Sequence, residues 1–504
     1  MSPRARHLAL GGAVAVAIVI VIRWALAHWD GLYDDTFIYL RYTKNLSKCP
    51  LSFNCADAPV EGFTSPLYLA LLWVGSWFTD QLIWLCQLIG TLAVCATIAL
   101  AALTARGARR DLETWTPAII AMATAGVLAL DPFVTLNTVN GMETALGGAM
   151  VTLVVYAAVC RRPWLLVVAS IASVLVRPES VLFVVALPVL PWMRRRRFLV
   201  VAGGALLVIE VVRYLIFGQL VPNTYVAKSG GTWEHAALGL AYIVDAVRDF
   251  PLVLLAPLAL FAPLRREVAY VLGVALVWLA FFLRSGGDLF EYSRLWYPLV
   301  PGLSALALVG AHAFLSRRGE RIALAASLVI TVVIAARAAI THYIPPQGVS
   351  ERIVLWAATG SYLRKNFKGG TVATVPIGAI GYYSSLPIID LVGLTDATIA
   401  REGRSVPPEL LTKRWIGHER NFTEYVLSRE PTVIVTTSVR PVPWRDVQEA
   451  RAGFWADWLL LQEIKNGRAP YRVHDAEVLP GQHVLMFVRE ATSPATSEDG
   501  RSSP

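Results

Sequence analysis

Apolar residues occur along this chain in long, nearly uninterrupted runs, which is typical of membrane-spanning helices. Such a helix needs about 20 apolar residues, and eleven runs before residue 341 approach that length. They cover residues 8–27, 81–105, 115–136, 144–160, 163–177, 179–193, 198–216, 250–264, 268–284, 296–314 and 321–340. The pattern predicts a polytopic α-helical membrane protein in which residues 1–340 form about eleven transmembrane helices.

Short arginine clusters between these runs predict the direction in which the helices cross the membrane. The clusters stand at every second boundary, at residues 4–6, 106–110, 161–162, 194–197, 265–266 and 317–321. Because cytoplasmic loops carry an excess of Lys and Arg, the first helix should start inside. The outside segments are then the loops around 28–80, 137–143, 217–249 and 285–295, and everything from Thr341 onward. We expect a multi-pass protein of the bacterial inner membrane with these segments in the periplasm.

The composition agrees with a membrane protein. Of the 504 residues, 56% are hydrophobic and 16% charged, which excludes a single soluble fold. The net charge of +9 would suggest a nucleic-acid partner in a soluble protein, but here the basic residues mark topology, so no nucleic acid is expected. Alternatively, the first run is a signal peptide cleaved after Ala27, although Arg23 and Trp24 interrupt the usual order of apolar core and cleavage site.

The first external loop contains two local features. Residues 62–78 are apolar but too short to span, and Ser65 and Pro66 mark a helix start, so the loop should contain a juxtamembrane helix on the outer surface. Cys49 and Cys55 lie in a compartment that permits disulfides, and we predict that they pair. The other cysteines fall inside apolar runs and are interpreted as small core residues.

Charge returns after the last apolar run, and shorter elements replace the membrane runs. Helical stretches such as 350–366 alternate with strand-like segments. The strand-like segments are residues 371–376, 432–436 and 483–488. We predict a small periplasmic α/β domain over residues 341–490. Ser, Thr, Pro and Asp dominate residues 491–504, which predicts a disordered tail.

Two adjacent acids, Asp34 and Asp35, open the first external loop and head a helical segment. The simpler interpretation is an N-cap plus a carboxylate in the first turn, stabilised by the helix dipole; it explains one acid more easily than two. The functional interpretation is that one carboxylate acts as a general base on an acceptor hydroxyl. We therefore predict Asp34 and Asp35 as catalytic residues.

Other polar residues share the predicted outer face. Each of them alone is more simply an interfacial anchor, but their joint location predicts a substrate pocket. The pocket residues are Arg41, Glu61, Thr64, Glu143, Glu179, Asn223, Tyr225 and Asp288, with Asn140 and Glu291 on the same side. Glu210 and Arg213 lie one turn apart inside an apolar run and should pair with each other in a structural role.

Basic residues on this face could hold a phosphate, and Arg177, Lys228 and Arg294 are the predicted ligands. A lipid-linked phosphate at the membrane surface would suit them. The sequence contains no nucleotide-binding glycine loop. No His or Cys cluster has metal-ligand spacing, so no metal site is predicted, and His342 and His418 are interpreted as surface residues.

Several motifs in order resemble a known family. In the first external loop they are D-D-T-F-I-Y-L-R-Y-T-K-N-L from Asp34, S-F-N from Ser52 and V-E-G-F-T-S-P-L from Val60. Further along they are N-G-M-E-T from Asn140, R-P-E from Arg177, P-N-T-Y-V-A-K from Pro222, G-G-D-L-F-E-Y-S-R from Gly286 and D-L-V-G-L-T-D from Asp390. These resemble the mycobacterial terminal β-(1→2) arabinofuranosyltransferases, within the GT-C glycosyltransferase superfamily.

The resemblance implies transfer of arabinofuranose or a related pentose from a polyprenyl phosphate to an acceptor outside the inner membrane. The lipid-linked sugar would be the donor, and no other cofactor is expected. By analogy Asp34 is the catalytic acid, with Asp35 beside it, and the basic trio holds the donor phosphate. The cysteine pair and the short external domain depart from the family, which leaves the acceptor open among glycan, lipid and protein. A retaining reaction would need either a second carboxylate as nucleophile, Asp35 or Asp288, or a front-face route.

Two other function classes stay open at this stage. A transporter or flippase of a lipid-linked sugar would also need polar groups on the outer side, but it should place charges and broken helices near the midplane. A non-catalytic assembly partner would present the external domain to other envelope proteins.

Overall fold

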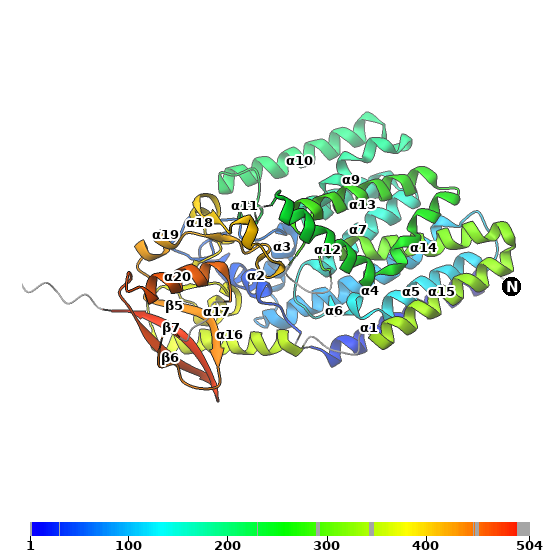
Figure 1. The fold of residues 1–504 in the computed structure, drawn as a ribbon. Coiled ribbons are helices and arrows are strands. Elements are labelled where there is room, and N and C mark those ends of the chain that lie inside the picture. The colour runs from blue at the N-terminus through cyan, green and yellow to red at the C-terminus, as the bar shows by residue number, and fades with distance from the viewer. Residues whose placement is uncertain are drawn as a thin grey trace, which may run out of the picture.

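The computed structural model describes residues 3–29, 31–228, 230–288, 293–341, 347–446, 448 and 453–490. A bundle of helices forms one end of the molecule, and a mixed α/β part formed by the C-terminal residues covers the other end (Figure 1). The N-terminus lies at the end of the bundle far from the sheet (Figure 1). The predicted tail 491–504 lies outside the described residues.

Each of the eleven predicted apolar runs contains a helix. Among the described residues, five segments are long and apolar enough to cross a membrane: α1 (Pro3–Ala27), α4 (Leu82–Ala108), α10 (Arg196–Phe217), α13 (Arg265–Ser285) and residues 297–318, which include α14 (Val300–Leu315). The shorter apolar helices are α5 (Thr116–Leu130), α7 (Thr144–Val159), α8 (Pro163–Val174), the segment 178–189 and η4 (Pro251–Phe261). The last run forms the 22-residue helix α15 (Glu320–Thr341). The count of eleven spans stays a prediction.

Proline positions explain why several predicted runs are broken. The run 115–136 is split because Asp131 caps a new short helix, α6 (Pro132–Leu136), by accepting from the backbone N–H of Phe133 at 2.9 Å. The run 179–193 becomes α9 (Val181–Val185) flanked by 3-10 turns that have a proline at their first or second residue. Proline lacks the N–H that a continuing helix requires and clashes with the preceding turn.

The first external loop contains two helices, α2 (Asp34–Asn45) and α3 (Pro66–Gly75). Helix α3 is the predicted juxtamembrane element: Ser65 accepts from the N–H of Tyr68, and Pro66 occupies the first turn. Between the helices, Cys49 and Cys55 form a disulfide, with Cα atoms 5.2 Å apart. On the same side of the bundle lie α11 (Asn223–Ala227) and α12 (Trp233–Asp249).

The C-terminal part begins with α16 (Gln347–Asn366) and contains a five-stranded sheet. In spatial order its strands are β2 (Ile388–Asp390), β1 (Val372–Thr374), β5 (Val433–Arg440), β7 (Gln482–Arg489) and β6 (Tyr471–Leu479). The first three strands run parallel, and the β5–β7 and β7–β6 pairs are antiparallel. The flanking elements are α17 (Ile377–Ser384), α18 (Ala397–Glu402), α19 (Thr423–Ser428), α20 (Trp455–Lys465) and the short β3 (Arg404–Ser405) and β4 (Arg420–Asn421).

The C-terminal part shares a hydrophobic core with the first external loop. Phe37 and Leu40 of α2 are fully buried in the same cluster as Ile380 of α17 and Val433 of β5, while the helices of the bundle form a second cluster. Helix α2 therefore lies between the two parts (Figure 1). This position puts its N-terminal aspartates at the junction of bundle and sheet.

Candidate active site

Asp35 belongs to a group of charged side chains at this junction. Its Oδ2 lies 3.5 Å from Nη1 of Arg294. Arg294 also donates through Nε and Nη2 to the carboxylate of Asp288. The side chains of Arg294 and Asp288 are buried, whereas that of Asp35 keeps 22% of its surface exposed. Asp35 is thus the accessible acid of this group.

A second ion pair adjoins the first and comes from the N-G-M-E-T and R-P-E motifs. Nη2 of Arg177 lies 3.2 Å from Oε1 of Glu143, and Nη1 lies 3.9 Å from Glu179. The negative charge of Glu143 lies close enough to both Arg177 and Arg294 to raise the pKa of each guanidinium group. Thr64 lies beside the hydroxyl of buried Tyr39. Glu143 and Arg177 are also close enough for their charges to influence the pKa of this hydroxyl. Six predicted residues therefore belong to one group that reaches Asp35 through Arg294: Arg294, Asp288, Arg177, Glu143, Glu179 and Thr64.

The C-terminal part contributes the third side of this group. Lys228, which is exposed, runs along Gly417, where an added Cβ would lie 3.6 Å from its Cδ and Cε. Asp35, Lys228 and Asp288 lie close enough to His418 for their charges to influence the pKa of its ring. Burial lowers the pKa of His418 from its ordinary 6.5, while Asp35 opposes this shift.

His418 was interpreted from the sequence as a surface residue, and that interpretation is wrong. The segment that carries it is fixed by Glu419, whose buried carboxylate lies 3.1 Å from Nε2 of His235 on α12 and accepts from the N–H of Gly417. His235 is held in turn by Thr232. Only the packing of the C-terminal part on α12 brings His418 to the site, so no local sequence signal could have found it.

Asp34 has a different environment from Asp35. Its two carboxylate oxygens accept the backbone N–H groups of Gly378 (3.0 Å) and Ala379 (2.8 Å) in the first turn of α17. Pro376, the N-cap residue of α17, supplies no side-chain acceptor, so Asp34 caps this helix from another part of the chain. A Cβ on Gly378 would lie 1.9 Å from the carbonyl oxygen of Asp34, so only glycine permits this approach.

The burial of Asp34 has an electrostatic consequence. Loss of hydration raises the pKa of Asp34 from 3.8 to about 6; the N–H of Ala379 opposes the shift, and the charge of Asp35 adds to it. The sequence offered two interpretations of Asp34: a catalytic acid, or a cap of its own helix. In the structure the N-cap residue of α2 is Tyr33, and Asp34 caps α17 instead.

Arg41, predicted to line the pocket, fastens the first loop to the C-terminal part. Its guanidinium donates to the carbonyls of Phe53, Gly381 and Leu386 at 2.7–2.8 Å and to Oδ1 of Asn54 at 2.9 Å. With these donors engaged, Arg41 has a structural role. Its place in the substrate pocket stays a prediction.

Glu61 and Asn223 are also engaged elsewhere. Oε2 of Glu61 accepts from Nε of Arg213 at 2.9 Å, and Arg213 also pairs with Glu210 at 2.6 Å, as predicted. Nδ2 of Asn223 donates to the carbonyls of Gly393 (2.7 Å) and Leu394 (3.0 Å). These side chains join the loop, α10 and the C-terminal part. Their place in the substrate pocket stays a prediction.

The remaining predicted residues are less constrained. Tyr225 on α11 is 52% exposed. Asn140 holds the start of α2, because its carbonyl accepts from the N–H of Tyr33 and from Oγ1 of Thr36. Glu291 and His342 lie outside the described residues. Within the described ranges, no group of three or more His, Cys, Asp or Glu side chains is arranged to hold a metal ion.

Comparison with known proteins gives similarities in sequence. A family model described as a domain of unknown function, DUF8728, matches residues 345–479. The terminal β-(1→2)-arabinofuranosyltransferase of Mycobacterium tuberculosis is 29% identical over 367 residues, which are 60% of this chain and 56% of the relative. The resemblance indicated by the motifs is confirmed, and the match spans just over half of the relative's length.

Two solved structures share the fold. ArnT from Cupriavidus metallidurans bound to undecaprenyl phosphate superposes with a TM-score of 0.54 at 15% identity, over 95% of this chain and 98% of that chain. Its apo form gives 0.51 at 12% identity, over 93% and 97%. This likeness concerns the fold alone. The chain is a polytopic helical membrane protein whose fold is that of ArnT.

Proposed function

We propose that this chain is a glycosyltransferase of the bacterial inner membrane with its active site on the periplasmic side. It moves arabinofuranose or a related pentose from a polyprenyl phosphate to an extracytoplasmic glycan, lipid or protein. The observation that carries the proposal is the group of Asp35, Arg294, Arg177 and Lys228, which combines an accessible acid with phosphate-binding cations. The similarity to an arabinofuranosyltransferase and the fold of an undecaprenyl-phosphate-bound protein support it.

The cations suit the donor phosphate for distinct reasons. Arg294 and Arg177 present planar forks that bind two oxygens at once, and both are oriented by buried carboxylates. Lys228 approaches from α11 as an exposed point charge. The contact between Arg294 and Asp35 is long, at 3.5 Å, so a phosphate competes for Arg294 and leaves Asp35 available to the acceptor.

Asp35 is our choice for the general base. Both carboxylate oxygens of Asp34 accept hydrogen bonds from the backbone of α17. Asp35 is the more exposed acid and lies beside Arg294. The acceptor oxygen attacks C1 of the sugar, the bond from C1 to the phosphate oxygen breaks, its electron pair leaves with the polyprenyl phosphate, and the hydroxyl proton passes to Asp35. This single displacement inverts C1. A retaining reaction would need a second carboxylate, for which Asp288 is the candidate.

Purified full-length protein in lipid nanodiscs, supplied with a panel of radiolabelled polyprenyl-phosphate sugars and a cell-envelope extract, tests the proposal. We expect transfer of a pentose and release of polyprenyl phosphate, and a loss of about 10²–10⁴-fold in the Asp35→Asn variant. The control is Asp80→Asn, an exposed acid of the same loop, which should keep full activity. Failure to transfer any sugar, or movement of the labelled lipid across proteoliposomes without transfer, would overturn the assignment.

A further inference from the structure

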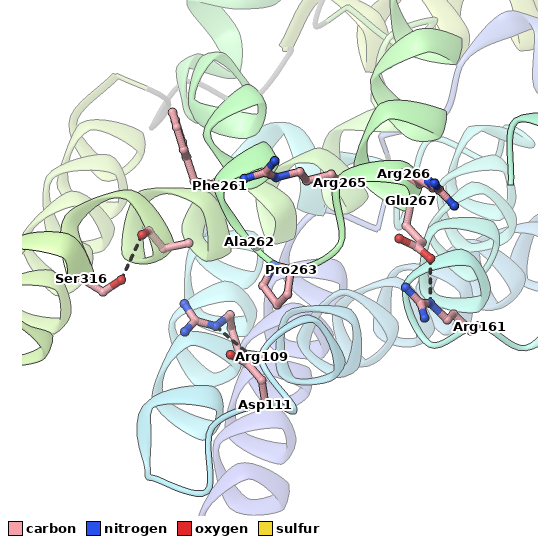
Figure 2. Close-up of a pocket in the computed structure, with 11 residues that line it drawn as sticks. Arg109, Asp111, Arg161, Phe261, Ala262, Pro263, Arg265, Arg266, Glu267 and Ser316 are labelled. Atoms are coloured by element: carbon pink, nitrogen blue, oxygen red, sulfur yellow. Dashed lines mark hydrogen bonds and ion pairs between the residues drawn. The ribbon is translucent and has the colours of Figure 1, made fainter. Parts of the chain in front are cut away.

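A cavity of about 710 Å³ lies where four helix ends meet (Figure 2), and no residue of the Asp35 group lines it. Its walls come from the C-terminal end of α4, the turn between α7 and α8, the turn into α13 and the end of α14. The arginine clusters predict that this end of the bundle faces the cytoplasm. Small-molecule sites measure roughly 300–1,000 Å³, so the cavity has the size of a ligand site.

Positive charge dominates the lining. Four arginines and two acids line the cavity, which leaves a net charge of +2: Arg109, Arg161, Arg265, Arg266, Asp111 and Glu267. Two of the arginines are held in place. Nε of Arg161 donates to buried Glu267 at 2.7 Å, and Arg109 donates to Nδ1 of His312 at 2.9 Å and contacts Asp111 (Figure 2).

Arg265 and Arg266 differ from the held pair. Both are exposed, and neither pairs with a carboxylate among the residues that the structure describes. They occupy the first two positions of α13, where the positive end of the helix dipole disfavours cations. The N-cap residue, Leu264, offers no side-chain acceptor to the amides of this turn. Glu267 in the first turn of α13 is taken up by Arg161. Two guanidinium groups that pair with no described carboxylate therefore line the cavity beside a helix N-terminus.

Apart from Ser316, the rest of the lining is apolar. Phe261, Ala262, Pro263 and Ala313 form part of the wall, and the guanidinium of Arg317 lies over the ring of Phe261, 4.5 Å from its centre. In Figure 2 the side chain of Arg265 extends toward Phe261. The cavity is much larger than a bare phosphate, and its apolar wall would contact the organic part of an ester.

We propose that this cavity binds a phosphate ester from the cytoplasmic side, with Arg265 and Arg266 as its main ligands. Guanidinium groups bind phosphate oxygens in pairs, and the N–H groups at the start of α13 add donors and a favourable dipole. The headgroup of an anionic phospholipid and a soluble phosphate ester offer the same chemistry. This site is separate from the proposed donor site and does not depend on it.

The test compares the full-length protein with the Arg265→Gln/Arg266→Gln double variant. Native mass spectrometry in detergent measures retention of phosphatidylglycerol against phosphatidylcholine. Thermal unfolding with and without glycerol 3-phosphate measures a soluble ester. Arg195→Gln/Arg196→Gln is the control, because these exposed arginines are the N-cap and first residue of α10 and do not line the cavity.

We expect the wild type and the control to bind with affinities within about twofold of each other, and the Arg265/Arg266 variant to lose at least tenfold. Selective loss of phosphatidylglycerol identifies a lipid headgroup as the ligand. Loss of the stabilisation by glycerol 3-phosphate identifies a soluble ester. Equal losses in both double variants would mean general charge attraction and would overturn the proposal, as would the absence of binding to the wild type.

Discussion

The proposed division of roles between Asp34 and Asp35 predicts that Asp34→Asn leaves the protein folded and active in transfer. Asparagine is as good a helix cap as aspartate, so it should replace the carboxylate at α17. One amide oxygen accepts from Gly378 or Ala379, and the other N–H loses its partner. An unpaired buried donor costs about 1–3 kcal/mol.

Removing the buried charge offsets this cost. The pKa of Asp34 rises from 3.8 to about 6, and a shift of that size means that the ionised form costs about 3 kcal/mol relative to the neutral one. Above pH 6 the asparagine variant avoids this cost. The two terms are of similar size, so α17 should change in stability by no more than about 2 kcal/mol.

Hydrogen–deuterium exchange of residues 377–384 at pH 8 measures this local stability, and the transfer assay measures activity. We expect Asp34→Asn to keep activity within a few-fold of the wild type, with protection of α17 changed by less than about 30-fold. Asp35→Asn should keep that protection and lose transfer. If Asp34→Asn lost transfer by more than 100-fold while α17 stayed protected, Asp34 itself would be the chemical acid and our reasoning would be refuted.

Three further predictions concern the junction of the bundle and the C-terminal part. Gly378→Ala forces a Cβ to within 1.9 Å of Asp34 and should cost about 1–3 kcal/mol, whereas Gly203→Ala, with nothing within 4 Å, should not lower the thermal midpoint. Arg41→Lys cannot reproduce four hydrogen bonds, so it should cost about 3 kcal/mol in detergent unfolding while the surviving folded fraction keeps its activity. The raised pKa of Asp34 makes the native state bind more protons than the unfolded state between pH 4 and 6. Its contribution to stability should therefore fall as the pH rises through that window, and unfolding curves of Asp34→Asn should lack this slope.

Much of the fold could be predicted because membrane helices are long apolar runs that can be recognised from local composition. The apolar runs and arginine clusters locate the helices of the bundle. Of the five strands of the main sheet, β1, β5 and β7 were found as apolar segments. Strand β2 was not predicted, although it is apolar and as short as β1. Strand β6 carries polar side chains along a half-exposed edge and gives no clear pattern.

Part of the site could also be predicted from local composition. Charged residues at helix ends could be assigned to one face, and Asp35, Arg294, Asp288, Arg177 and Glu143 do come together. The sequence could not distinguish a residue that binds substrate from one whose hydrogen bonds hold two parts of the protein together. Partners of Arg41 and Asp34 in the C-terminal part lie 340 to 345 positions away along the chain. Only tertiary packing decides whether such a buried polar group is already satisfied.

Helix geometry explains how two adjacent acids came to differ. Successive side chains on an α-helix point about 100° apart, so when Asp34 faces α17, Asp35 is turned toward Arg294 on the bundle. The bond from Asp34 to α17 fixes the rotation of α2 and hence the direction of Asp35. The C-terminal part also supplies His418 beside Asp35. Docking of this part therefore orients the proposed base and completes its surroundings, which makes the C-terminal part a component of the site and more than a platform for an acceptor.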